Sequence, residues 1–140
     1  MPKFTGRCAC SNLTYESDAE PLRMLNCHCR DCQRASGSGF APLLAFARDR
    51  VTLSGTLSHY ADKSDRGTIM RRGFCPTCGS PITLEPDARP DVLFVLAASL
   101  DDPGLHKPSA DIWVRSAQPW DHLDAAIPRY ETRHPNIFGG

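Results

Sequence analysis

Seven cysteines fall into three close groups along the chain: Cys8 and Cys10; Cys27, Cys29 and Cys32; Cys75 and Cys78. At C-x-C and C-x-x-C spacing, neighbouring sulfurs can face a single ion, which predicts metal binding. Zinc is the ion we expect, because it accepts tetrahedral sulfur ligation and is not redox-active. Magnesium, calcium and manganese prefer oxygen ligands instead.

The seven sulfurs divide into a set of four and a set of three. A structural zinc is closed by four protein ligands, whereas a catalytic zinc keeps three and leaves one position for water or substrate. The two separated pairs would form a structural site from Cys8, Cys10, Cys75 and Cys78. The open, catalytic site would be formed by Cys27, Cys29 and Cys32. We therefore expect two zinc ions per chain, the second held more loosely.

Other interpretations of the cysteines have weaker support. A thioredoxin-like redox pair belongs beside a β-α-β pattern, which this sequence lacks. Buried free thiols are common, but not in three groups at ligand spacing. An iron–sulfur cluster stays open, because cysteine sets bind iron as well. His28 could be a fourth ligand of the triplet, although on a strand it would point away from the cysteines that flank it.

Length, charge and the number of cysteines limit the classes of protein to which this chain can belong. A chain of 140 residues predicts a single domain spanning residues 1–140. Sixteen basic and sixteen acidic residues give zero net charge, which argues against a dedicated nucleic-acid-binding protein. Residues 1–7 lack a secretory signal, and the most apolar segment, 92–100, is too short to cross a membrane. We therefore expect a cytoplasmic protein, in which cysteines stay reduced. The odd number of cysteines agrees, because disulfide pairing would leave one thiol without a partner.

Short strands are expected to position the cysteines, because twelve prolines and ten glycines leave little room for long helices. Apolar patterns predict strands at residues 4–8, 13–17, 22–28, 40–47, 51–53, 57–61, 68–74, 81–84, 92–98 and 112–114. Segment 92–98 should be a central strand buried on both faces, although a helix stays open there. We further expect a helical turn at 31–35, a polar turn at 62–67 and an irregular tail. Cys75 and Cys78 should lie at a hairpin tip, where Pro76 and Gly79 suit the turn.

The cysteine groups and their neighbours resemble one family of proteins. The segments are Gly-Arg-Cys-Ala-Cys at 6–10, Cys-His-Cys-Arg-Asp-Cys-Gln-Arg at 27–34, Ser-Gly-Ser at 36–38 and Phe-Cys-Pro-Thr-Cys-Gly-Ser at 74–80. Ala-Ser-Leu-Asp-Asp-Pro at 98–103 and Pro-Trp at 119–120 are similar too. Together they resemble the glutathione-dependent formaldehyde-activating enzyme family, also called the CENP-V/GFA domain, over a core of about residues 3–130.

The resemblance implies a fold and an activity. The fold would be a mainly β, Mss4-like β-tent of small antiparallel sheets stapled by zinc, with little helix. The implied division of zinc ligands is the same four plus three. The activity would be that of a carbon–sulfur lyase that forms and cleaves S-hydroxymethylglutathione, so glutathione or another small thiol, plus an aldehyde, would be the partners. The family often has histidine where Asp111 stands, which leaves the exact substrate open.

Thiol addition to a carbonyl requires a proton transfer, and nearby candidates are Asp31, His28, Ser36 and Ser38. Asp31 and Ser36 could instead satisfy turn amides. A substrate carboxylate could pair with Arg34, Arg71 or Arg72, which could equally be solvated surface residues. The alternative function is a non-catalytic, zinc-stabilised protein-binding module. A third is metal storage or redox sensing at the cysteine triplet.

Overall fold

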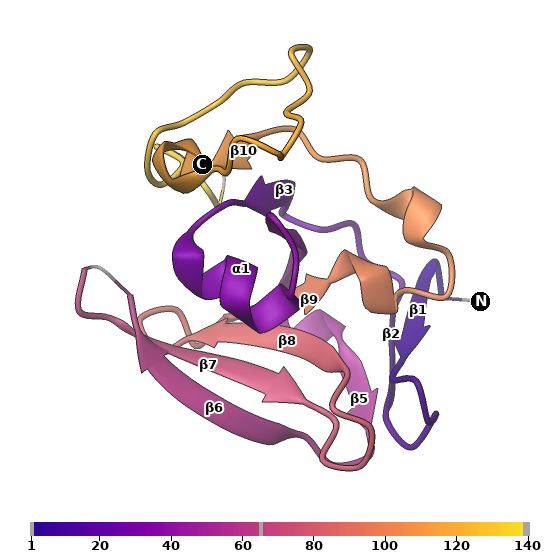
Figure 1. Cartoon of the computed structure of the whole chain (residues 1–140). Coiled ribbons are helices and arrows are strands. Elements are labelled where there is room, and N and C mark those ends of the chain that lie inside the picture. Colours follow the sequence, from indigo (N-terminus) through magenta and orange to yellow (C-terminus); the bar gives the residue numbers. More distant parts are fainter. Residues whose placement is uncertain (1, 65, 139–140) are drawn as a thin grey trace.

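The structure is a computed structural model that describes residues 2–64 and 66–138. Within these residues it has ten β-strands in two sheets, one α-helix and four 3-10 helices (Figure 1). The 3-10 helices are η1 (Arg48–Arg50), η2 (Ala97–Ser99), η3 (Pro103–Leu105) and η4 (Val114–Ser116). The fold is mainly β with little helix, as expected.

The smaller sheet has three antiparallel strands in the order β1-β2-β5. They are β1 (Phe4–Arg7), β2 (Thr14–Ser17) and β5 (Thr52–Ser54). The turn from β1 to β2 carries Cys8 and Cys10 and includes Ser11 in a left-handed conformation, with φ of 66°. The first cysteine pair therefore lies at the tip of a hairpin.

The larger sheet has seven strands in the order β10-β3-β4-β9-β8-β7-β6. They are β3 (Arg23–Cys27), β4 (Ala41–Ala47), β6 (Ser58–Lys63), β7 (Ile69–Phe74), β8 (Pro81–Pro86), β9 (Val92–Leu96) and β10 (Asp111–Ile112). All neighbours are antiparallel except β10 and β3, which are parallel. The two sheets, antiparallel apart from this one pair, agree with the mainly β fold that was expected.

Helix α1 (Arg30–Ser36) follows β3 after two residues. The Cys29 sulfur caps its first turn by accepting a bond from the Cys32 N–H, at 3.3 Å. The helix ends at Gly37, which has a φ of 68° and donates its N–H to the Gln33 carbonyl. A glycine suits this left-handed position because it has no Cβ to clash with the backbone.

Two apolar cores cover the two faces of the larger sheet. On one face Leu44 and Phe46 of β4 pack with Phe4 of the smaller sheet, where the rings of Phe4 and Phe46 meet edge to face at 5.4 Å. On the other face Leu43 of β4 packs with Phe94 of β9. All five residues of β9 are buried, which confirms the expected central strand, but the strand ends at Leu96 and the predicted residues 97–98 belong to η2. Neighbouring residues of one strand alternate between the two cores, as the pleat requires.

The late strand predicted at residues 112–114 is wrong beyond its first residue. Strand β10 consists of Asp111 and Ile112, and Trp113 has a left-handed backbone with φ of 58°. The chain therefore turns at Trp113 and continues into η4. Strand β6 extends to Lys63, so the predicted turn at 62–67 is shorter than expected, and its Asp65 lies outside the described residues.

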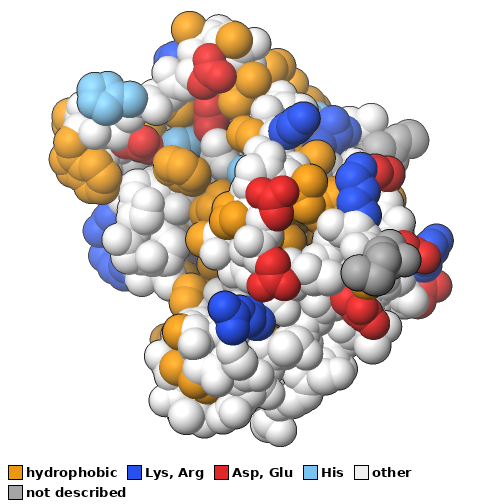
Figure 2. Space-filling view, turned by 90° about the vertical axis from the view of Figure 1, so that its right-hand side faces the viewer, with side chains coloured by type: hydrophobic (Ala, Val, Ile, Leu, Met, Phe, Trp, Pro, Cys, Tyr) orange, Lys and Arg blue, Asp and Glu red, His pale blue; other side chains and the backbone are white. Residues whose placement is uncertain are grey.

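Surface charges are mixed in sign. Figure 2 shows acidic and basic side chains interspersed over one face of the molecule, as the zero net charge suggests. Among the residues that the structure describes, no helix combines the length and apolar character that crossing a membrane would require.

Candidate metal centres and active site

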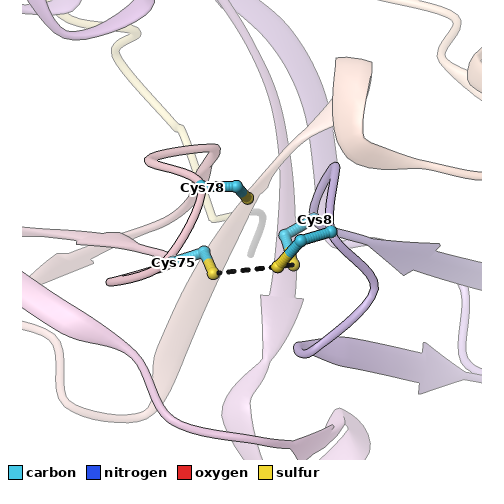
Figure 3. Close-up of side chains that lie close together, drawn as sticks. Cys8, Cys75 and Cys78 are labelled. Carbon is cyan, nitrogen blue, oxygen red and sulfur yellow. Dashed lines mark hydrogen bonds between the residues drawn. The ribbon is translucent and has the colours of Figure 1, made fainter.

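Four sulfurs from the two hairpin tips come together, and Figure 3 shows Cys8 of the first tip facing Cys75 and Cys78 of the second. The Sγ atoms of Cys8, Cys10, Cys75 and Cys78 all lie within 4.8 Å of one another. The Cys8 and Cys10 sulfurs are 3.6 Å apart, and those of Cys10 and Cys75 are 3.7 Å apart. Zinc–sulfur bonds of about 2.3 Å at tetrahedral angles place sulfurs about 3.8 Å apart. The spacing therefore fits a zinc ion.

The second hairpin tip is a compact turn. Gly79 has a φ of 77° and donates its N–H to the Cys75 carbonyl at 2.8 Å. The Ser80 hydroxyl lies 3.2 Å from the Cys78 sulfur and is the largest cause that lowers the pKa of this thiol, to about 5. On the first tip, the Leu13 N–H donates to the Cys8 sulfur at 3.3 Å. Such donors favour thiolates, the form that binds metal.

Three further sulfurs meet where β3 passes into α1. Cys27 ends β3, Cys29 caps the helix and Cys32 lies in its first turn, and their Sγ atoms lie within 4.8 Å of one another. Cys27 and Cys32 are buried, while Cys29 is half-buried. No fourth histidine, cysteine or carboxylate among the described residues joins this group. The three sulfurs could therefore hold a metal ion with three protein ligands.

A positive charge beside the three cysteines would favour their thiolate forms. Hydrogen bonds from the Cys27 and Cys32 thiols lower the pKa of Cys29 to about 2, while the same contact with Cys29 raises the pKa of Cys27. Only one of the crowded thiols therefore ionises easily without a positive charge between them. Arg72 supplies part of this charge, with its Nη1 3.7 Å from the Cys32 sulfur. Burial acts to lower the pKa of Arg72, but Cys32 and Asp62 raise it.

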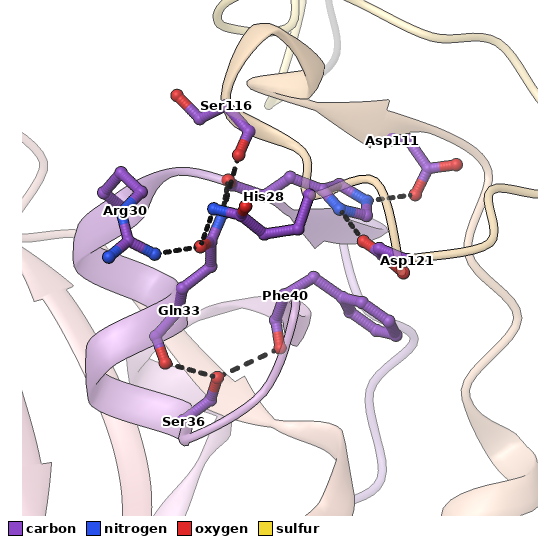
Figure 4. A network of polar contacts seen from close by, with 9 residues as sticks. His28, Arg30, Gln33, Ser36, Phe40, Asp111, Ser116 and Asp121 are labelled. Atoms are coloured by element: carbon purple, nitrogen blue, oxygen red, sulfur yellow. Dashed lines mark hydrogen bonds and ion pairs between the residues drawn. The ribbon is translucent and has the colours of Figure 1, made fainter.

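His28 does not join the three sulfurs, as predicted, although strand β3 ends at Cys27 and His28 lies just beyond it. Its Nε2 lies 2.8 Å from Asp111 Oδ1 and its Nδ1 lies 2.8 Å from Asp121 Oδ2 (Figure 4). The three side chains are at most 8% exposed. We call this group, His28 with Asp111 and Asp121, the His28 bracket. It connects the cysteine segment to β10 and to the C-terminal segment.

Gln33 anchors the other side of the cysteine segment (Figure 4). Its buried side-chain amide donates to the His28 carbonyl at 2.7 Å and to the Ser116 carbonyl at 2.9 Å. Its oxygen accepts from Arg30 and from Gln118. The backbone between Cys27 and Cys32 is therefore fixed from two directions, which orients the three sulfurs.

The triplet opens onto a cavity of about 850 Å³. Its floor is the second apolar core, formed by side chains of strands β3, β4, β9, β8 and β7, namely Leu25, Leu43, Phe94, Leu84 and Met70. The lining is also rich in guanidinium groups, which belong to Arg30, Arg34, Arg66, Arg72, Arg89 and Arg133. Asp31 is the one acidic residue among the described residues that line it. An apolar floor together with cationic side chains suits a small anionic organic ligand.

The structure separates the residues that we predicted to act on substrate. Asp31, Arg34 and Arg72 line the cavity. His28, Ser36 and Ser38 are absent from the lining, and the Ser36 hydroxyl donates to the Cys32 carbonyl at 2.7 Å. Arg71 lies elsewhere on the surface and pairs with Asp87 through two nitrogens, at 2.8 and 3.1 Å. The sequence reasoning missed Asp121 and the tail residues 133–138, which have no local motif that could have identified them.

Comparisons with known proteins place the chain in a family. The family model described as glutathione-dependent formaldehyde-activating enzyme matches residues 3–116. A Schizosaccharomyces pombe protein described as an uncharacterized lyase is 26% identical over 82 residues, which are 59% of this chain and 57% of the yeast protein. The match thus spans little more than half of that relative.

The fold is also found in a solved structure. A crystal structure of a Rhodobacter sphaeroides protein superimposes with a TM-score of 0.55 at 20% identity, and the match covers 89% of this chain and 98% of that one. At this identity the likeness concerns the fold. Because the family model covers most of the sequence, including all seven cysteines, the chain belongs to the glutathione-dependent formaldehyde-activating enzyme family.

Proposed function

We propose that this protein is a zinc-dependent carbon–sulfur lyase that acts on a thiol–aldehyde adduct such as S-hydroxymethylglutathione. The observation that carries the proposal is the three-sulfur cluster of Cys27, Cys29 and Cys32, open toward a cavity large enough for a tripeptide-sized ligand. Family membership and the yeast relative described as a lyase support the same class of reaction.

The reaction would break the carbon–sulfur bond of the adduct. The electron pair of that bond goes to sulfur, the adduct hydroxyl loses its proton, and the carbonyl of the aldehyde forms. A zinc ion held by the three cysteines would supply the positive charge that favours a thiolate at neutral pH. Asp31 is the carboxylate in the cavity lining, so we assign it the hydroxyl proton, which later returns to the released thiolate.

Arg72 would act beside this centre as a fixed positive charge. Its guanidinium is only 15% exposed, and its Nε donates to Asp62 Oδ2 at 2.9 Å, which fixes its orientation. From there Nη1 reaches the Cys32 sulfur. The group would stabilise negative charge on the crowded sulfurs, while the apolar floor keeps water away from the adduct.

The four-sulfur cluster has a different proposed role. Cys8 and Cys10 come from the smaller sheet and Cys75 and Cys78 from the larger one, so a zinc ion there would crosslink the two sheets. With four protein ligands no position is left for substrate, and binding would contribute to folding. We therefore propose two zinc ions per chain, one structural and one catalytic.

The test is an exchange experiment on a panel of small thiols with and without aldehydes. NMR exchange spectroscopy reports the rate at which a hemithioacetal forms and breaks. We expect acceleration over the uncatalysed rate with zinc-loaded protein, and loss of that acceleration in Cys32→Ser. Arg72→Ala should reduce the acceleration, and Arg71→Ala is its matched control, because Arg71 is an exposed residue of the same strand but lies outside the cavity. No acceleration with two zinc ions bound would refute the lyase and favour the non-catalytic binding module.

A further inference from the structure

The C-terminal segment forms a wall of the active-site cavity. All six residues from 133 to 138 belong to the cavity lining, together with Leu84 and Phe94 of the sheet. This segment lies beyond residue 116, where the match to the family model ends. Residues 133–138, which lie outside the family match, therefore line the same cavity as Cys27, Cys29 and Cys32.

The wall is held in place by specific contacts. Arg23 of β3 donates to the carbonyls of Asn136 and Ile137, at 2.6 and 3.2 Å. The Phe138 ring lies 4.1 Å beneath the Arg89 guanidinium carbon and 6.0 Å from the Phe94 ring. Hydrogen bonds to backbone carbonyls and stacking on a cation together fix both the course of the segment and its last ring.

Charge in the cavity lining is only partly neutralised by the protein. Arg72 pairs with Asp62, and Arg89 pairs with Asp91. Arg34, Arg66 and Arg133 line the same cavity, and none of them forms an ion pair with any described residue. Arg30 also forms no ion pair with any described residue, but its guanidinium donates to the Gln33 side chain, so three guanidinium groups are left for an anionic ligand. Of these, Arg133 is the one that the wall contributes.

We propose that Arg133 is a specificity-determining residue that binds a carboxylate of the substrate thiol away from its sulfur. Guanidinium groups bind carboxylates through paired, charge-assisted hydrogen bonds. The wall thereby selects acidic thiols over neutral thiols of the same size. This inference rests on the proposed lyase function and adds to it a means of substrate selection located outside the family match.

The kinetic test compares glutathione with its diethyl ester, which keeps the thiol but masks both carboxylates. Arg133→Ala should raise KM for the glutathione adduct about tenfold with kcat unchanged, because about 1.4 kcal/mol of binding is lost. KM for the ester should not change. Arg133→Lys should recover part of the affinity. Arg129→Ala is the matched control, since Arg129 lies four residues before Arg133 in the chain but does not line the cavity.

A binding measurement separates this inference from the lyase function. Calorimetry with S-methylglutathione, which cannot form an adduct, should show binding to the wild type and about tenfold weaker binding to Arg133→Ala. Equal binding to both proteins, or an equal KM, would overturn the role of Arg133 whether or not the enzyme is active. Arg133-dependent binding without any lyase activity would refute the proposed reaction and leave the anion site standing.

Discussion

Removing one carboxylate from the His28 bracket should cost much less stability than removing both. The bracket sets one imidazole between two carboxylates, with 2.8 Å contacts at both ring nitrogens. Asp111→Ala loses one charged hydrogen bond, worth about 1.5–3 kcal/mol, but it also removes one of two like charges. His28 keeps Asp121 as its partner. We therefore expect Asp111→Ala to lower the free energy of unfolding by about 1–2 kcal/mol.

The second substitution should have the larger effect. Removing Asp121 as well leaves a buried imidazole without any carboxylate partner, and losing the last partner of a buried group of this kind costs about 3–5 kcal/mol. Asp111→Ala/Asp121→Ala should therefore lose about 4–7 kcal/mol in total, more than twice the loss from one substitution. In a double-mutant cycle the excess appears as a coupling energy of about 2 kcal/mol.

Urea unfolding of the zinc-loaded proteins, followed by circular dichroism, measures these differences from the midpoints with a shared slope. Zinc content is determined in parallel, so that a lost ion is not mistaken for a lost contact. Asp101→Ala is the control, because the Asp101 carboxylate accepts from Thr5 in an exposed contact and should change stability by less than about 1 kcal/mol. Strictly additive losses, or 4 kcal/mol or more from Asp111→Ala alone, would show that the two carboxylates do not act together on the His28 imidazole.

Three further outcomes follow from the structure. Cys75→Ser should abolish soluble folding, whereas Cys32→Ser should leave a folded protein with one zinc ion; equal loss of folding would contradict two separate roles, as zinc analysis and circular dichroism will show. Gly79→Ala should cost about 1 kcal/mol in urea unfolding, because a Cβ there meets nothing within 4 Å but φ is +77°. Phe138→Ala should lower the unfolding free energy by about 1–2 kcal/mol through the lost stacking on Arg89, and an unchanged midpoint would show that the wall is not held there.

The grouping of the sulfurs could be predicted from spacing because it is mostly local geometry. Cys27 and Cys29 flank one residue at a strand end, and Cys75 and Cys78 flank a two-residue turn, so each group is fixed by a few backbone angles. The pairing of the two distant groups required only that four ligands close a zinc site. The structure brings together the same four and the same three sulfurs.

Contacts between distant segments could not be predicted in this way. Asp121 follows His28 by 93 residues in an irregular segment, where no hydrophobic period indicates which side chains face inward. The left-handed turn at Trp113 also has no signal, because glycine or asparagine is the usual residue there. This turn ends β10 at Ile112, and the chain continues into η4. No sequence pattern therefore predicts that residues 133–138 line the cavity. That His28 does not join the sulfurs could be predicted from the sequence.

The two cysteine clusters belong to different apolar cores, one on each face of the larger sheet. Cys8 and Cys75 lie in the core shared with the smaller sheet, whereas Cys27 and Cys32 lie in the core beneath the cavity. If zinc occupies both clusters as proposed, the two ions leave independently, and the three-ligand cluster empties first when zinc is scarce. Such a protein would pass through zinc starvation folded but inactive, and would regain activity on resupply without having to refold.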